Sequence, residues 1–103
     1  MPKIVLKNFV ECIEEERYFD AHETLEAIWF ERRFEDNDEV KLLRCFINAA
    51  VSFELAKRKK ELPRKKVWQN YLKYKKIIPK VESQYLKYYL QIIKYLEEKN
   101  NLI

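Results

Sequence analysis

The chain contains no glycine in 103 residues, whereas an average protein of this length carries about seven. Gly-rich phosphate loops, dinucleotide-binding fingerprints and nucleophile elbows all need glycine at fixed positions, so these classes of site are excluded. Tight β-hairpin turns most often contain glycine, so the chain also lacks their usual residue. The absence of glycine therefore favours helices joined by ordinary turns over a sheet protein.

Five segments carry apolar residues at the 3.6-residue spacing of an amphipathic helix, and none alternates for long with the two-residue period of a strand. These segments span residues 3–16, 20–33, 39–60, 63–78 and 81–99. The third is apolar over most of its circumference, which is typical of a central helix. We therefore predict one all-α domain over residues 1–103, a bundle of about five helices with an antiparallel hairpin of the second and third at its centre.

Local signals predict where several of these helices begin and end. Asp20 and Glu23 have the spacing of a capping box at the start of the second helix. Asp38 is a suitable N-cap for the third helix. Pro63 fits the first turn of the fourth helix, and Pro79 is expected to end it.

Charge is distributed unevenly along the chain, whose net charge is +4. Residues 1–56 carry seven basic and thirteen acidic residues, whereas residues 57–103 carry fourteen basic and four acidic ones. The densest basic stretch consists of Lys57, Arg58, Lys59, Lys60, Arg64, Lys65 and Lys66. Trp68, Tyr71 and Tyr74 follow it, and basic residues beside aromatic ones can hold phosphates and stack bases. Nucleic-acid binding is therefore one role open to this stretch, and a solvated helix face is the other.

The second predicted helix carries a polar stripe. His22, Glu26, Trp29 and Arg33 stand at i, i+4, i+7 and i+11, so they share one side of the helix, next to the apolar side. A histidine and a carboxylate one turn apart can bind a divalent metal together, or form an ion pair that orients the imidazole. We therefore expect a polar cleft around His22 and Glu26.

A metal or acid–base site needs at least one more group from another helix, and Glu54 is the candidate. Glu54 shares a sector of the third helix with apolar residues, so its carboxylate needs a partner, and His22 can be that partner. His22, Glu26 and Glu54 are thus the candidate catalytic and metal-ligating residues. The metalloprotease motif is excluded because its second histidine is missing. The alternative is a purely structural polar cluster, in which these side chains only tie the helices together. No cofactor is predicted, except that a divalent transition metal is possible at this site.

Two other features of the third predicted helix lead to predictions. Arg44, Asn48 and Ser52 form a polar stripe, from which Asn48 can reach Glu26 or a loop carbonyl. Cys45, like Cys12 in the first helix, falls in an apolar pattern, and we expect both to be free buried thiols. A Cys–His nucleophile that uses Cys45 is the less favoured alternative.

The second helix also carries a family resemblance. Residues 18–29 read YFDAHETLEAIW, which resembles the F-[ED]-A-H-E-x-[LW]-E-x-x-W signature of the domain of unknown function 309 family. Residues 44–53 are similar to the helix that follows in that family, with Arg and Cys in place of its Gln and Gly. The resemblance covers about residues 4–56 and implies a small all-helical fold, but no particular reaction. With Arg33 and Arg44 from the stripes above, it gives the predicted binding residues Glu23, Trp29, Arg33, Arg44 and Asn48.

The last predicted helix has an apolar arc of about 220°, although about 100° is enough to face one core. The arc consists of Tyr85, Leu86, Tyr88, Tyr89, Leu90, Ile92, Ile93, Tyr95 and Leu96. The excess predicts an exposed patch and a homo-oligomer, with a two-fold dimer favoured. The alternative is that this helix lies in a groove between two others.

The sequence also predicts a compartment. Its start lacks the apolar core of a signal peptide, and its longest uncharged run, residues 45–53, is far shorter than the roughly 20 residues that span a bilayer. With two unpaired cysteines, these features predict a cytoplasmic protein without a membrane partner. The high Lys, Glu, Ile and Tyr content predicts a thermophilic source.

Overall fold

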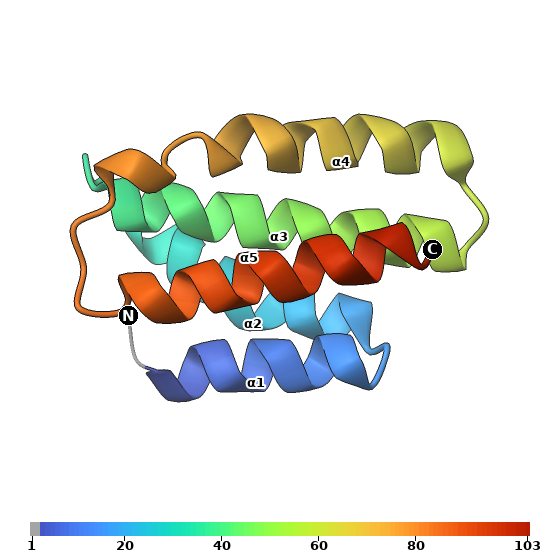
Figure 1. The fold of residues 1–103 in the computed structure, drawn as a ribbon, viewed down its shortest axis with the longest axis horizontal. Helices are drawn as coiled ribbons and strands as arrows, with labels where there is room; N and C mark the ends of the chain where they lie inside the picture. The colour runs from blue at the N-terminus through green and yellow to red at the C-terminus, as the bar shows by residue number, and fades with distance from the viewer. Residues whose placement is uncertain (1–2) are drawn as a thin grey trace.

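The computed structural model describes residues 3–103, and this part of the chain is built from helices without strands (Figure 1). The α-helices are α1 (Lys3–Glu14), α2 (Tyr18–Arg32), α3 (Asp38–Lys57), α4 (Glu61–Lys75) and α5 (Leu86–Asn101), with a short 3₁₀ helix, η1 (Ile78–Lys80), before α5. Helices make up 80% of the described residues, which confirms the all-α prediction. No helix of this range combines the length and the apolar character that a bilayer crossing requires.

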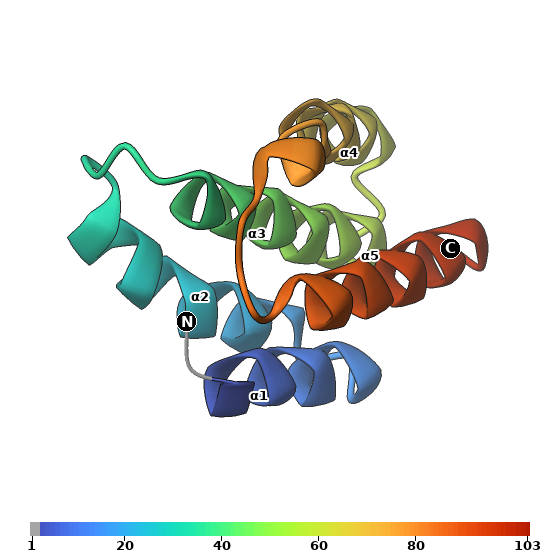
Figure 2. The same ribbon diagram turned by 60° about the vertical axis from the view of Figure 1, so that its left-hand side comes forward.

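Helix α3 lies at the centre of the bundle (Figures 1 and 2). It packs against α2 on one side and α4 on the other, and it also contacts η1. Consecutive α-helices run in opposite directions, so α2 and α3 form the antiparallel hairpin that the sequence predicts. The other two α-helices lie at the outside, α1 against α2, and α5 beside α1, α3 and α4.

Phe46 in α3 joins three helices in the core. Its side chain is fully buried, and its ring centroid lies 6.0 Å from that of Phe9 in α1 and 6.1 Å from that of Tyr89 in α5. Aromatic pairs at this separation add to the free energy gained from burying their area. Phe46 therefore links the α2–α3 hairpin to the two outer helices.

Helix α5 buries most of its apolar arc against the rest of the chain. Tyr89, Ile92, Ile93 and Leu96 are buried, and of the remaining arc residues only Leu90 is classed as exposed, at 46%. The uncovered remainder of the arc is Leu90 together with parts of the partly buried Tyr85, Leu86, Tyr88 and Tyr95. It is smaller than the wide arc suggests, because one helix in contact with α1, α3 and α4 is covered over a wider arc than a helix that faces a single neighbour. Self-association stays a prediction.

Several helix ends differ from those predicted. The capping box at Asp20 is wrong, because α2 already begins at Tyr18 and has no side-chain cap. Asn37 rather than Asp38 caps α3, and its side chain accepts hydrogen bonds from the amides of the second and third helical residues, at 2.8 and 3.3 Å. The last helix starts at Leu86 rather than near Val81, because η1, which contains Pro79, and an extended Val81 precede it.

Two turns place a non-glycine residue in the left-handed region where glycine is usual. Glu16 after α1 has φ 60°, and Lys59 after α3 has φ 59°. At each turn the next amide donates to the carbonyl five residues before it, from Arg17 to Cys12 (2.8 Å) and from Lys60 to Leu55 (2.9 Å). These are Schellman caps, whose left-handed residue is most often glycine. The chain therefore makes glycine-type helix ends without glycine.

We expect Glu16→Gly to raise the free energy of unfolding by about 1 kcal/mol, because it relieves the steric cost of the left-handed conformation at an exposed position. Glu11→Gly, at an exposed position inside the same helix, is the matched control and is expected to lower it by about as much. Urea denaturation of both variants measures whether each substitution raises or lowers the free energy of unfolding. A destabilising Glu16→Gly would show that this turn carries no such strain.

A hydrogen bond from α5 to the first turn of α3 makes stability depend on pH. The Tyr89 hydroxyl donates to Glu39 Oε1 over 2.6 Å. Burial acts to raise the pKa of Glu39, but hydrogen bonds to its carboxylate, that of Tyr89 foremost, bring the pKa below its ordinary value of 4.5. A carboxyl group whose pKa is lower in the folded state stabilises the protein above its unfolded-state pKa, and this contribution is lost as the pH falls through the folded-state pKa.

Tyr89→Phe is expected to destabilise the protein by about 1.5–3 kcal/mol at neutral pH, the usual contribution of a hydrogen bond to a charged group. The difference from the parent should shrink as the pH falls below 4.5, because Glu39 then takes up a proton in both proteins. Urea denaturation at a series of pH values measures it, with Tyr88→Phe on the same helix as the control. A difference that does not change with pH would contradict this role of Glu39.

Candidate functional site

The polar stripe of α2 lies beside its buried face. Ala21 and Leu25 are fully buried, and the adjacent His22, Glu26 and Trp29 are each partly buried. This pattern follows from 3.6 residues per turn, which sets each stripe residue next to a core residue. The stripe is therefore positioned by a rigid helix at the border between core and solvent, as the sequence predicts.

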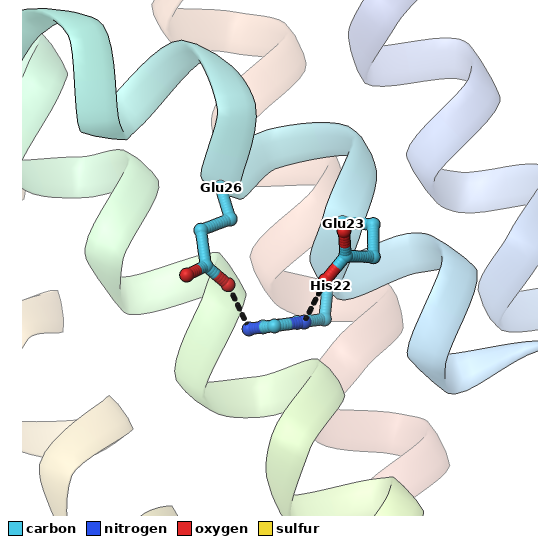
Figure 3. Close-up of side chains that lie close together, drawn as sticks. All are labelled: His22, Glu23 and Glu26. Carbon is cyan, nitrogen blue, oxygen red and sulfur yellow. Dashed lines mark ion pairs between the residues drawn. The ribbon is translucent and has the colours of Figure 1, made fainter.

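His22 lies between two carboxylates of its own helix (Figure 3). Its Nδ1 is 3.5 Å from Glu23 Oε1, and its Nε2 contacts Glu26 Oε2. One donor atom from each of the three side chains lies within 4.8 Å of the other two. The His22 side chain is 23% exposed, and the carboxylates are more open, at 58% for Glu23 and 43% for Glu26. The cluster is therefore accessible to a small ion.

One oxygen of the cluster is buried although its carboxylate is partly open. Glu26 Oε2 is shielded from solvent and accepts no hydrogen bond from the described residues, so its contact with His22 Nε2 lacks hydrogen-bond geometry. A buried carboxylate oxygen needs a hydrogen-bond donor or a cation. A protonated imidazole is one such cation, and a metal ion between the nitrogen and the oxygen is another.

A groove of about 320 Å³ between α2 and α3 opens beside His22. Glu54 lines this groove with His22, but it does not belong to the cluster of donor atoms within 4.8 Å. Its Oε1 instead accepts a 3.0 Å hydrogen bond from Arg58, the C-cap residue of α3, four positions further along the chain. The expected His22–Glu54 pairing is therefore replaced by this ion pair, because an arginine at i+4 can reach the carboxylate along its own helix.

Of the three residues in the predicted polar stripe of α3, one bonds within its own helix and the others contact a neighbouring helix. The Asn48 side-chain amide donates to the Arg44 carbonyl of its own helix, at 2.8 Å, rather than to Glu26 or a loop. Ser52 is fully buried and donates to the Arg64 carbonyl at 3.3 Å, which joins α3 to α4. Arg44 leans over the Trp29 ring, with its guanidinium carbon 5.4 Å from the ring centroid.

Trp29, Arg33 and Arg44 line a second and larger cavity, of about 500 Å³. The sequence predicts these three as site residues, but not the contribution of α4 and the segment after it. The missed residues are Lys73, Tyr74, Lys76, Ile77 and Lys80. Their spacing is that of an ordinary basic helix end, and only the packing of α4 on α3 brings them to α2.

The basic stretch from 57 to 66 lies on the surface around the turn from α3 to α4. All seven of its basic residues are exposed except Arg64, which is partly buried. The aromatic residues that follow are packed inside, since Tyr71 is fully buried and Trp68 stacks on it with ring centroids 4.3 Å apart. These two rings are therefore not free to stack on bases, and nucleic-acid binding by this stretch stays a prediction.

Both cysteines are free and buried, as expected. Burial raises the pKa of Cys45 far above its ordinary value, and its thiol donates to the Tyr71 carbonyl at 3.5 Å. A nucleophilic cysteine needs the opposite shift, toward the thiolate. Cys45 is therefore a core residue, and the Cys–His nucleophile has no support.

The model of one protein family, described as a domain of unknown function (DUF309), matches residues 6–67, more than half of the chain. The chain belongs to the DUF309 family. The DUF309 match includes His22, Glu23, Glu26 and Trp29, and it ends early in α4. No curated protein and no solved structure matches the chain. Family membership thus agrees with the resemblance at α2 and brings no established function.

Proposed function

We propose that this protein binds a divalent transition metal ion through His22 and Glu26. The observation that carries the proposal is the buried Glu26 Oε2, which faces His22 Nε2 and accepts no hydrogen bond within residues 3–103. An imidazole nitrogen and a carboxylate oxygen one helical turn apart are suitable ligands for Zn²⁺ and its neighbours. For an ion between them the two atoms must separate to about 3 Å, as bonds of about 2 Å to each ligand require. Both side chains are partly open to solvent, so this rearrangement needs no change in the core.

Glu23 has a different role in this proposal. Its carboxylate lies on the Nδ1 side of the imidazole, 3.5 Å away, whereas Glu26 lies on the Nε2 side. Histidines that ligate a metal through one nitrogen commonly donate the other N–H to a carboxylate, which fixes the tautomer and the ring orientation. Glu23 is therefore the positioning residue of His22, and Glu26 is the second ligand.

The groove beside His22 leaves room for the remaining ligands. Two ligands from α2 leave positions of the ion open to water, and open positions are typical of catalytic rather than structural metal sites. When bound, such an ion lowers the pKa of a coordinated water and supplies a hydroxide near neutral pH. Glu54 and Arg58 lie in the same groove and can hydrogen-bond to a ligand that enters it. This arrangement supports a metal-dependent hydrolytic reaction in preference to metal-free acid–base catalysis.

Thermal unfolding with and without metal tests the proposal. At an ion concentration of 100 times Kd, binding to the folded state alone adds about 2.7 kcal/mol to the stability. For a domain of this size, we expect the Tm to rise by about 10 °C or more. The protein should carry no added histidine tag, and Zn²⁺, Mn²⁺ and Fe²⁺ are compared with Mg²⁺, which binds imidazole poorly. An unchanged Tm with every transition metal would contradict the proposal.

We further propose that the protein acts in the cytoplasm. Two free, buried thiols fit a reducing compartment, where disulfides are rare.

A further inference from the structure

The 500 Å³ cavity lies where α2, α3 and the end of α4 meet, and its size is that of an ordinary small-molecule site. Its apolar lining comes from Trp29, Val40, Tyr74 and Ile77. Trp29 and Tyr74 are only partly buried, so parts of both rings remain open to a ligand. A flat apolar group can therefore be accommodated against this lining.

The charged lining of this cavity is almost entirely positive. Its cations are Arg33, Lys41, Arg44, Lys73, Lys76 and Lys80, and Glu35 is the one carboxylate that the described residues contribute to it. Glu35 is already held by Arg32, which lies outside the lining, through two hydrogen bonds of 3.0 Å. Lys41 pairs with Asp36 at 3.2 Å. The charges of the other cations are left without a carboxylate partner among the described residues.

Arg44 connects the apolar and the charged parts of the cavity. Its guanidinium carbon lies 5.4 Å from the Trp29 centroid and 4.9 Å from the Tyr74 centroid. Contacts with two rings hold the planar guanidinium in place while its N–H groups remain unpaired with any described carboxylate. A guanidinium fixed in this way is suited to bidentate recognition of a phosphate.

We propose that this cavity binds a nucleoside diphosphate, with the base against the Trp29 and Tyr74 rings and the phosphates at the cations led by Arg44. A single carboxylate neutralises one charge, whereas a diphosphate carries enough negative charge for several of these cations. A bare phosphate would leave the apolar lining without a partner, whereas the base of a nucleotide covers it. The site does not depend on the metal proposal, because His22, Glu23 and Glu26 are not among its lining residues.

Isothermal titration calorimetry tests the site, with ADP as the probe and EDTA present so that no metal takes part. We expect ADP to bind, and adenosine and inorganic pyrophosphate, which each lack one half of the ligand, to bind at least about tenfold more weakly, since each tenfold step corresponds to about 1.4 kcal/mol. The affinity for ADP should fall as salt is raised, because the cations are open to solvent. Pyrophosphate that binds as tightly as ADP would overturn the nucleotide assignment.

Matched variants locate the binding. Arg44→Gln and Lys76→Gln are expected to weaken ADP at least about tenfold, whereas Lys94→Gln, which removes an exposed charge on α5, should leave it unchanged. His22→Gln should bind ADP as the parent does. No binding of ADP at low salt, or equal losses in Lys94→Gln and Arg44→Gln, would overturn the proposal, whatever the outcome of the metal titrations.

Discussion

Phe46→Ala is expected to lower the free energy of unfolding by about 3–5 kcal/mol, the usual cost of removing a buried phenylalanine ring. The cost belongs to the upper part of this range, because the lost ring contacts Phe9 and Tyr89 and so joins α1 and α5 to α3. A domain of this size is stable by only about 5–15 kcal/mol, so the variant should be close to unfolding at physiological temperature.

Phe34→Ala provides the control, because Phe34 is 88% exposed. Its expected effect lies within about 0.5 kcal/mol, as for most surface substitutions. Urea denaturation followed by far-ultraviolet circular dichroism measures both variants. Similar losses in the two would mean that the core does not have Phe46 at its centre.

His22→Gln is expected to lower the affinity for Zn²⁺ at least about 100-fold, beyond the 10–100-fold that follows from losing a residue that only orients a ligand. Glu26→Gln should have an effect of similar size, since an amide oxygen lacks the negative charge of the carboxylate. Glu23→Gln should lose about 10–100-fold, because Glu23 positions His22 and does not ligate the ion. Competition with a chromophoric chelator measures these affinities.

Glu31→Gln is the matched control for this series. Glu31 is exposed on the same helix and is not part of the cluster, so its loss changes the net charge by the same amount. Its Zn²⁺ affinity should equal that of the parent. If Glu31→Gln and Glu26→Gln weaken Zn²⁺ equally, the metal is attracted by general surface charge and not by the cluster.

The fold could be predicted because its determinants are periodic and local. The apolar spacing of each helix and the wide apolar circumference of α3 were enough to place five helices and a central hairpin. Helix ends were less predictable, since capping depends on the tertiary path. Asn37 and Asp38 are both good capping residues, and the turn before α3 selects Asn37. The Schellman caps at Glu16 and Lys59 contain no glycine, so the sequence gives no signal that predicts them.

The candidate site could be predicted as far as it lies on one helix. The spacing of His22 and Glu26 fixes their approach, because residues four apart in a helix are neighbours. The contribution of α3 could not be predicted in the same way, since the competition of Arg58 for Glu54 depends on side-chain rotamers. The larger cavity was missed because its lining comes from three segments of the chain, and no one of them shows a pattern of its own.

The metal proposal has a direct spectroscopic test, because His22 is the only histidine in the chain. Two-dimensional NMR of the imidazole ring nitrogens therefore reports on one residue without the need for assignment. On addition of one equivalent of Zn²⁺, we predict that the Nε2 resonance moves to the position of a metal-bound nitrogen, while Nδ1 keeps its proton beside Glu23. Ring-nitrogen resonances that do not change with Zn²⁺ would contradict the proposal that this protein binds a metal through His22.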